Sequence, residues 1–186
     1  MFKYGSLKLF IVKVFVGFVF TGFASIYIGS LLSYDSADPG FKTFVTSEKS
    51  IEINNYFGFF GAYLSSYSII IIGLFSYVVG FFVLIEGIKV LLGIKNRFLT
   101  LRFLSCLFGL FFIGIFLLFY KFELIKTGLV SVFFLDLLSQ YIYSNIQYPV
   151  LIFIINLVIL IVGTILIILS FSIKLKFLKY LINFLK

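Results

Sequence analysis

Residues 32–41 read LSYDSADPGF and end a long apolar stretch of the chain. An aromatic ring, Tyr34, is followed by two acids, Asp35 and Asp38, and then by a Pro-Gly pair. The residue before a proline is disfavoured in helical geometry, and the Pro-Gly pair fits the two central positions of a type II turn. The stretch therefore predicts that a helix stops here and that the chain turns, with Tyr34 at a membrane–water interface.

The composition places the rest of the chain in a membrane. Of 186 residues, 62% are hydrophobic and 12% are charged, so a water-soluble fold would expose a largely hydrocarbon surface. Histidine is absent and Cys106 is the single cysteine, which excludes a Cys/His zinc site and an internal disulfide. We therefore expect no metal site and no cofactor.

Four segments are long and apolar enough to cross a hydrocarbon layer of about 30 Å as helices. The last of them has a proline well placed to start the helix. The predicted fold is an all-α polytopic membrane protein, a single four-helix transmembrane domain over residues 1–186, with an outer loop at 34–63. The four spans are predicted at 10–33, 64–88, 101–120 and 149–172.

The segment 121–148 connects the third and fourth spans and carries polar side chains at three- and four-residue spacing. This pattern on an otherwise apolar piece is typical of a helix that lies in the outer membrane interface with one polar stripe. Re-entry into the membrane is the alternative. The polar stripe consists of Asp136, Gln140, Ser144 and Gln147.

The lysine and arginine residues indicate how the chain crosses the membrane. If the N-terminus is cytoplasmic, the inside segments hold eleven of the fifteen basic residues and the outside loops hold four, Lys42, Lys49, Lys121 and Lys126. The positive-inside rule then predicts that both termini are cytoplasmic. The net charge of +8 reflects this orientation, so DNA binding is not needed to explain it. The inside residues are Lys3, Lys8, Lys13, Lys89, Lys95, Arg97, Arg102, Lys174, Lys176, Lys179 and Lys186.

Small residues at regular spacing predict close helix packing, which drives association in lipid because burial of apolar surface gains nothing there. The seams either hold one bundle together or face another subunit. In the second span, Phe82 lies about 200° around the helix from Gly80 and is expected to face lipid. The seams consist of Gly17, Thr21, Ser25, Gly29 and Ser33 in the first span, Ser66, Gly73, Gly80 and Gly87 in the second, and Ser105 and Gly109 in the third.

Few polar groups lie deep in the predicted spans. Lys13 and Glu86 lie near the cytoplasmic ends, where Glu86 can pair with Lys89 one turn on. Asn156, inside the fourth span, predicts a hydrogen bond between helices. A small transporter or channel, the alternative function, would need more polar groups than these. A membrane enzyme would need an activated nucleophile or an acid pair, which the pattern does not offer.

Two motifs in order resemble the N-terminal four-helix membrane domain of FtsK/SpoIIIE-type DNA translocases. The first is SYDSADPGF after the first span, and the second is NYFGFFGAYLSSYSIIIIGLFSYVV at the second. Helix number, spacing and topology agree with the family over nearly the whole chain. The residues that match the family's motifs are Tyr34, Asp35, Asp38, Pro39, Asn55, Gly58, Gly61, Ala62, Gly73 and Tyr77, and the bundle seam adds Gly80.

The chain also departs from the family. Ser65-Ser66 stands where the family often has Ala-Asp, and Gly80 stands where it often has a proline. No Gly-x4-Gly-Lys-Ser/Thr phosphate loop is present, so the motor that hydrolyses ATP is not encoded here. The chain is expected to be an anchor without its motor, as an excerpt, a truncated gene product or a stand-alone paralogue.

The resemblance implies a place and partners for such an anchor. The place is the bacterial inner membrane at the division septum. The partners are the lipid bilayer, other division proteins and further copies of the chain in a hexamer. DNA would be contacted only through a motor domain that this sequence does not contain.

Overall fold

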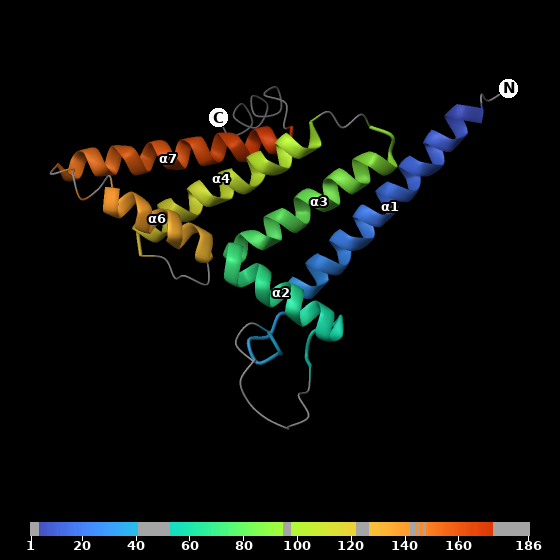
Figure 1. The fold of residues 1–186 in the computed structure, drawn as a ribbon, viewed down its shortest axis with the longest axis horizontal. Helices are drawn as coiled ribbons and strands as arrows, with labels where there is room; N and C mark the ends of the chain where they lie inside the picture. The colour runs from blue at the N-terminus through green and yellow to red at the C-terminus, as the bar shows by residue number, and fades with distance from the viewer. Residues whose placement is uncertain are drawn as a thin grey trace, which may run out of the picture. The chain divides into compact units, whose positions relative to one another are not determined.

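The computed structural model describes residues 4–40, 53–94, 98–121, 127–141, 144, 146 and 148–172. Every element over these residues is helical and none is a strand, which confirms the predicted all-α fold class. Figure 1 shows their arrangement along the chain. The elements are α1 (Tyr4–Leu32), α2 (Gly58–Ile72), η1 (Gly73–Phe75), α3 (Ser76–Leu91), α4 (Leu99–Phe119), α6 (Leu129–Tyr141) and α7 (Pro149–Ser170).

Four helical segments in the described residues are long and apolar enough to cross a membrane, as the sequence predicted. Their side chains point largely outward, as expected of helices in contact with lipid rather than water. In α7, the buried residues are the polar or small Asn156, Gly163 and Ser170, while the apolar residues around them are exposed or half-buried. The segments are Phe10–Leu32, Gly58–Leu91, Leu99–Phe119 and Pro149–Ser170.

The chain divides into two compact units, Met1–Arg97 and Phe98–Lys186, which we call unit 1 and unit 2. The sequence analysis treated residues 1–186 as one domain. Each unit contains a pair of antiparallel membrane helices, and each is described by itself below.

In unit 1, α1 and α3 pack along their length through glycines. A Cβ atom on Gly80 would lie 2.8 Å from Ile28 of α1, and one on Gly87 would lie 2.8 Å from the backbone nitrogen of Thr21. At the other end of the contact, Gly17 meets Leu91 in the same way. The seam glycines of α3 are therefore used inside the chain rather than against another subunit.

The seam of small residues predicted on α1, spaced four residues apart, follows this contact only in part. Ser25, in the middle of the row, is exposed, whereas Ala24 and Tyr27 are buried. Four residues advance a helix by about 400°, so the row drifts by about 40° at each step. It leaves α3 at Ser25 and returns to contact with the chain at Gly29, where a Cβ would lie 2.7 Å from the ring of Phe57.

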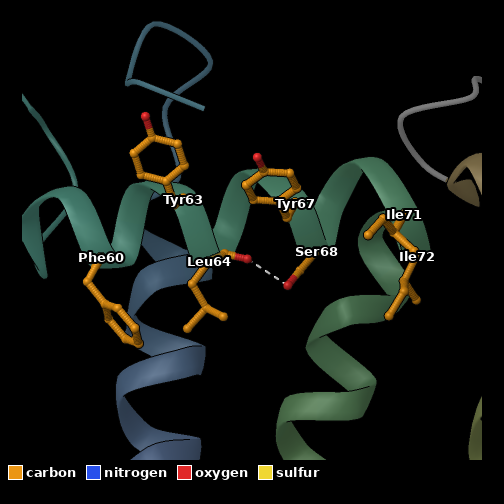
Figure 2. A pocket seen from close by; sticks show the side chains of 7 residues that line it. All are labelled: Phe60, Tyr63, Leu64, Tyr67, Ser68, Ile71 and Ile72. Atoms are coloured by element: carbon orange, nitrogen blue, oxygen red, sulfur yellow. Dashed lines mark hydrogen bonds between the residues drawn. The ribbon is translucent and has the colours of Figure 1, made fainter. Parts of the chain in front are cut away.

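The second membrane segment is divided at Gly73, where the sequence analysis placed one continuous span over 64–88. Gly73 has φ 72°, a conformation that favours glycine, and its N–H closes α2 on the carbonyl of Ile69. The Ser76 hydroxyl bridges the break by donating to the Ser68 carbonyl at 2.8 Å. In Figures 1 and 2, α2 lies across the ends of α1 and α3.

This break corrects two expectations about the second span. Ser66 does not share a stripe with Gly80, because the two residues lie on different helices; Ser66 instead meets Gly40. Phe82 does not face lipid, since it is 2% exposed, whereas its neighbour Phe81 is 50% exposed. Val79 and Glu86, in line with Phe82 on the helix, are buried as well, so α3 is covered on more than one face.

Glu86 forms the predicted ion pair with Lys89, at 2.7 Å, near the end of α3. The carboxylate is almost fully buried and the lysine is half-buried. Because Lys89 and the exposed Lys13 both lie at the Tyr4–Gly17 end of the antiparallel pair, the described basic side chains of unit 1 gather at one end.

In unit 2, α4 and α7 are antiparallel and cross at two glycines. A Cβ on Gly109 would lie 2.8 Å from the carbonyl oxygen of Gly163, and a Cβ on Gly163 would lie 2.9 Å from that of Gly109. The Arg102 Nε donates to the Ser170 carbonyl at 2.7 Å and caps the end of α7. Asn156 is buried, and its amide donates to the Ile152 carbonyl of its own helix at 3.0 Å.

Helix α6 packs on α4, with the rings of Phe134 and Phe111 stacked 6.3 Å apart. Asp136, Gln140 and Ser144 of the predicted polar stripe are exposed. The position of α6 at the membrane interface stays a prediction. Several residues on which the sequence analysis relied lie outside the described residues: Lys3, Lys42, Lys49, Lys95, Arg97, Lys126, Gln147, Lys174, Lys176, Lys179 and Lys186.

Candidate functional site

The end of α1 at Leu32 is held by side chains from the second motif. The last carbonyls of a helix have no partner within the helix. The Asn55 amide nitrogen donates to the carbonyls of Ser30, at 2.9 Å, and Ser33, at 3.3 Å. Its amide oxygen accepts the backbone N–H of Phe57 at 3.2 Å, which sets the orientation of the amide, because a backbone N–H can only donate. Asn55 thus closes the end of α1 from inside the fold.

Tyr77, in the first turn of α3, supplies a second bond to the same helix end. Its hydroxyl donates to the Leu31 carbonyl at 2.7 Å. The Tyr77 ring packs against a buried apolar cluster of Tyr27, Leu31 and Ile69, to which α1 and α2 contribute. Because Tyr77 starts α3, this bond joins the beginning of one membrane helix to the end of another.

The two acids of the first motif bind a single residue, Asn54. Asp38 accepts the Asn54 backbone N–H at 2.8 Å, and Asp35 accepts the Asn54 side-chain amide at 2.8 Å. Asp35 also accepts the N–H of Ala37 at 2.9 Å. The bonds from Ala37 and Asn54 lower the pKa of Asp35. We call Asp35, Asp38, Asn54, Asn55 and Tyr77 together the clamp.

The turn in the first motif is made earlier than predicted. The Asp38 N–H donates to the Asp35 carbonyl at 3.3 Å, which places a four-residue turn over Asp35–Asp38. Gly40 does not have the positive φ that a type II turn at Pro39-Gly40 requires. Its lack of a side chain instead admits Ser66 of α2, which a Cβ on Gly40 would overlap.

Asp38 is 6% exposed, and its second oxygen, Oδ2, is buried without a hydrogen-bond partner in the part of the chain that the structure describes. Pro39 is buried beside it. The first motif is therefore packed into unit 1 rather than standing away from it as a loose polar loop.

The entry to α2 depends on two glycines. Gly58 has φ 60°, and its N–H donates to the Asn55 carbonyl at 2.9 Å, so the chain turns directly after the clamp asparagine. A Cβ on Gly61 would overlap the Asn55 amide oxygen and lie 2.8 Å from Phe57. Ala62 is 1% exposed. Small residues at these positions let Asn55 reach the end of α1.

Most of the residues singled out by the sequence therefore meet at one end of unit 1. Gly73 lies at the bend between α2 and α3, and Gly80 lies further along α3 against α1. Sequence reasoning missed Asn54, although an Asn-Asn pair before a helix is itself a turn signal. The residues that gather at the Leu32 end are Tyr34, Asp35, Asp38, Pro39, Asn55, Gly58, Gly61, Ala62 and Tyr77.

The clamp offers structural rather than reactive chemistry. Apart from Asp38 Oδ2, the hydrogen bonds described for it run to backbone groups and between its own members. Over the described ranges, no group of three or more His, Cys, Asp or Glu residues could hold a metal ion. The arrangement fixes the end of one membrane helix to the start of the next.

Comparison with known proteins identifies the family of the chain. A family model described as the 4TM region of DNA translocase FtsK/SpoIIIE matches residues 11–181, which include both motifs and all four membrane segments except Phe10. Searches of curated proteins and of solved structures found no match. Because the match covers most of the chain, the protein belongs to the family of the four-transmembrane region of FtsK/SpoIIIE DNA translocases.

Proposed function

We propose that the chain is the membrane anchor of an FtsK-type DNA translocase and acts in cell division and chromosome segregation. The observation that carries the proposal is the family match over residues 11–181, in a chain with four membrane-spanning segments. The proposed location is the division septum of the bacterial inner membrane. The proposed partners are other division proteins and further copies of the chain.

A localisation experiment tests the septal role. The chain carries a fluorescent protein after Lys186 and is expressed in dividing bacterial cells in place of the membrane region of the resident translocase. We expect fluorescence concentrated at the septum. An even distribution around the cell membrane would contradict septum targeting while leaving membrane anchoring intact.

We further propose that both ends of the chain are cytoplasmic. The antiparallel pair in unit 1 supports this orientation, since it brings Lys13 and Lys89 to the end opposite Asp35 and Asp38. Reporter enzymes active on only one side of the membrane are fused after Ser47 and after Lys186. We expect the Ser47 fusion to report the outside and the Lys186 fusion the cytoplasm, and a cytoplasmic Ser47 would overturn the orientation.

The anchor itself is proposed to carry no motor activity, because its sequence has no phosphate loop. The purified chain in detergent is expected not to hydrolyse ATP, with or without DNA. Weak retention of DNA by the basic residues would fall with added salt and would not count against the proposal. ATP turnover that persists through purification and increases with DNA would contradict it.

A further inference from the structure

A groove runs along one face of α2 (Figure 2) and has a volume of about 350 Å³. Phe60, Leu64 and Ser68 point to the side of α2 on which α1 and α3 lie. The hydroxyl groups of Tyr63 and Tyr67 point to the opposite side. Ile71 and Ile72 close the groove near the bend. The helix therefore has an apolar lower side and a tyrosine-bearing upper side.

The lower side of the groove presents an apolar surface, because its one polar side chain is already hydrogen-bonded. Ser68 is the only polar residue among the three that point downward. Its hydroxyl donates to the Leu64 carbonyl at 2.7 Å. The Ser68 carbonyl accepts the hydroxyl of Ser76. Phe60 is 61% exposed at one end of the groove. Tyr63 and Tyr67 also line the groove, with their hydroxyls on its upper side. The part of an occupant that lies along Phe60, Leu64 and Ser68 must therefore be hydrocarbon, because the side chains there present no free donor to a polar group.

The depth of α2 in the bilayer follows from the helices beneath it. Lys13 and Lys89 lie at the same end of unit 1, where their ammonium groups can reach the membrane surface. At 1.5 Å per residue, about 28 Å of helix separates Lys13 from Leu32, close to the hydrocarbon thickness of about 30 Å. Helix α2 crosses at the Leu32 end and so lies at the opposite boundary between hydrocarbon and headgroups.

The groove is also continuous with the surface of α3 that faces the membrane. Ile71, at its end, is exposed, and so is Leu74, which follows the bend in η1. Phe81 and Ile85 continue the exposed apolar surface along α3. Lipid that covers α3 therefore reaches the groove without crossing a polar surface.

We propose that the α2 groove binds one acyl chain of a phospholipid from the leaflet at the Leu32 end, with the lipid's glycerol and phosphate beside the tyrosine side of the helix. Tyrosine is suited to this level of the membrane because its ring is apolar and its hydroxyl is polar. The bound lipid covers the groove and holds α2 flat on the bilayer. This proposal concerns unit 1 in its membrane and does not depend on the division role.

The sidedness of α2 is tested with tryptophan fluorescence, since the chain contains no tryptophan. Phe60→Trp and Tyr63→Trp variants are reconstituted in phosphatidylcholine vesicles whose acyl chains carry bromine near the glycerol. We expect bromine to quench Phe60→Trp and to quench Tyr63→Trp less. Equal quenching of the two, or none in either, would overturn the placement of α2.

Binding in the groove is separated from general contact with lipid by a blocking variant. Ile71→Trp reports on the groove and Phe81→Trp on lipid around α3. Adding Ser68→Phe fills the groove one turn from Ile71 and leaves Phe81 untouched. We expect Ser68→Phe to remove most of the bromine quenching of Ile71→Trp and none of that of Phe81→Trp. Unchanged quenching of Ile71→Trp in a variant with an unaltered melting temperature would overturn the proposed site.

Discussion

The hydroxyl of Tyr77 donates a 2.7 Å hydrogen bond to the backbone carbonyl of Leu31, 46 residues earlier in the chain. Leu31 is buried, so without Tyr77 its carbonyl would lose this partner in a place that water does not reach. A membrane offers the carbonyl no replacement either. This single bond links the two long helices of unit 1 at the end where α2 crosses them.

Tyr77→Phe removes this hydroxyl and keeps the ring. We expect it to destabilise the protein by about 1–2 kcal/mol, since the buried carbonyl loses its shorter bond and keeps only the 3.3 Å bond from the Tyr34 N–H. The measurement is the thermal midpoint in detergent. Tyr56→Phe is the matched control, because Tyr56 is 80% exposed. A midpoint lowered equally by both changes would show that the bond to Leu31 has no special role.

Asn55→Leu removes both the amide donor and the amide acceptor at the end of α1. We expect a larger loss than for Tyr77→Phe, about 2–3 kcal/mol, because the carbonyls of Ser30 and Ser33 both lose a donor. Asn54→Ala is the control, since Asn54 is exposed and keeps its backbone bond to Asp38. If Asn55→Leu and Asn54→Ala lowered the melting temperature equally, Asn55 would not be the residue that closes the end of α1.

Asp35 predicts a pH dependence of stability. Hydrogen bonds from Ala37 and Asn54 favour the ionised carboxylate, so its pKa in the folded protein is lower than its usual value of 3.8. The contribution is therefore present above pH 3.8 and is lost as the pH falls through the lowered pKa. Melting in detergent is followed from neutral pH to below pH 3.8 for the natural chain and for Asp35→Asn.

We expect Asp35→Asn to flatten part of the decrease in melting temperature at acid pH. Asn54→Ala removes one of the two donors, so it should reduce the same part of the decrease without abolishing it. If the melting profile of Asp35→Asn followed that of the natural chain throughout the acid range, Asp35 would not be linked to folding.

The sequence predicted the membrane segments because length and composition alone determine them. The pairing of Glu86 with Lys89 and the close approach at Gly80 were also predictable, since both depend on positions within one helix. The bend at Gly73 was not, because the stretch around it contains no proline or charge to mark a break. In the sequence, a glycine at this position is compatible with either a helix seam or a helix end. In the structure, the positive φ of Gly73 shows that it ends a helix.

The bonds of the clamp were beyond local pattern analysis for a different reason. Asn55 and Tyr77 contact the backbone of α1 from 25 and 46 residues away, and helical periodicity carries no information about such distant partners. The resemblance to a family singled out both residues but not what they bind. The burial of Phe82 was not predicted, because the glycine spacing indicates only one contact face on this helix.

Gly80→Ala and Gly22→Ala form a matched pair on the two helices of unit 1. A Cβ on Gly80 would lie 2.8 Å from Ile28 and 3.2 Å from Tyr27, closer than side chains normally approach. We expect Gly80→Ala to destabilise by about 1–3 kcal/mol through overpacking. A Cβ on Gly22 meets nothing within 4 Å, so Gly22→Ala should be neutral or slightly stabilising, because alanine favours the helix.

A second substitution, on α1, tests whether the effect of Gly80→Ala comes from the contact between the two helices. Ile28→Ala removes the side chain that a Cβ at position 80 would meet, so Gly80→Ala should cost less in that background than alone. Phe81→Leu, on the exposed side of α3, serves as the surface control for the same melting experiment in detergent. If Gly80→Ala were as mild as Gly22→Ala and unaffected by Ile28→Ala, the close contact between α1 and α3 would not exist in the membrane protein.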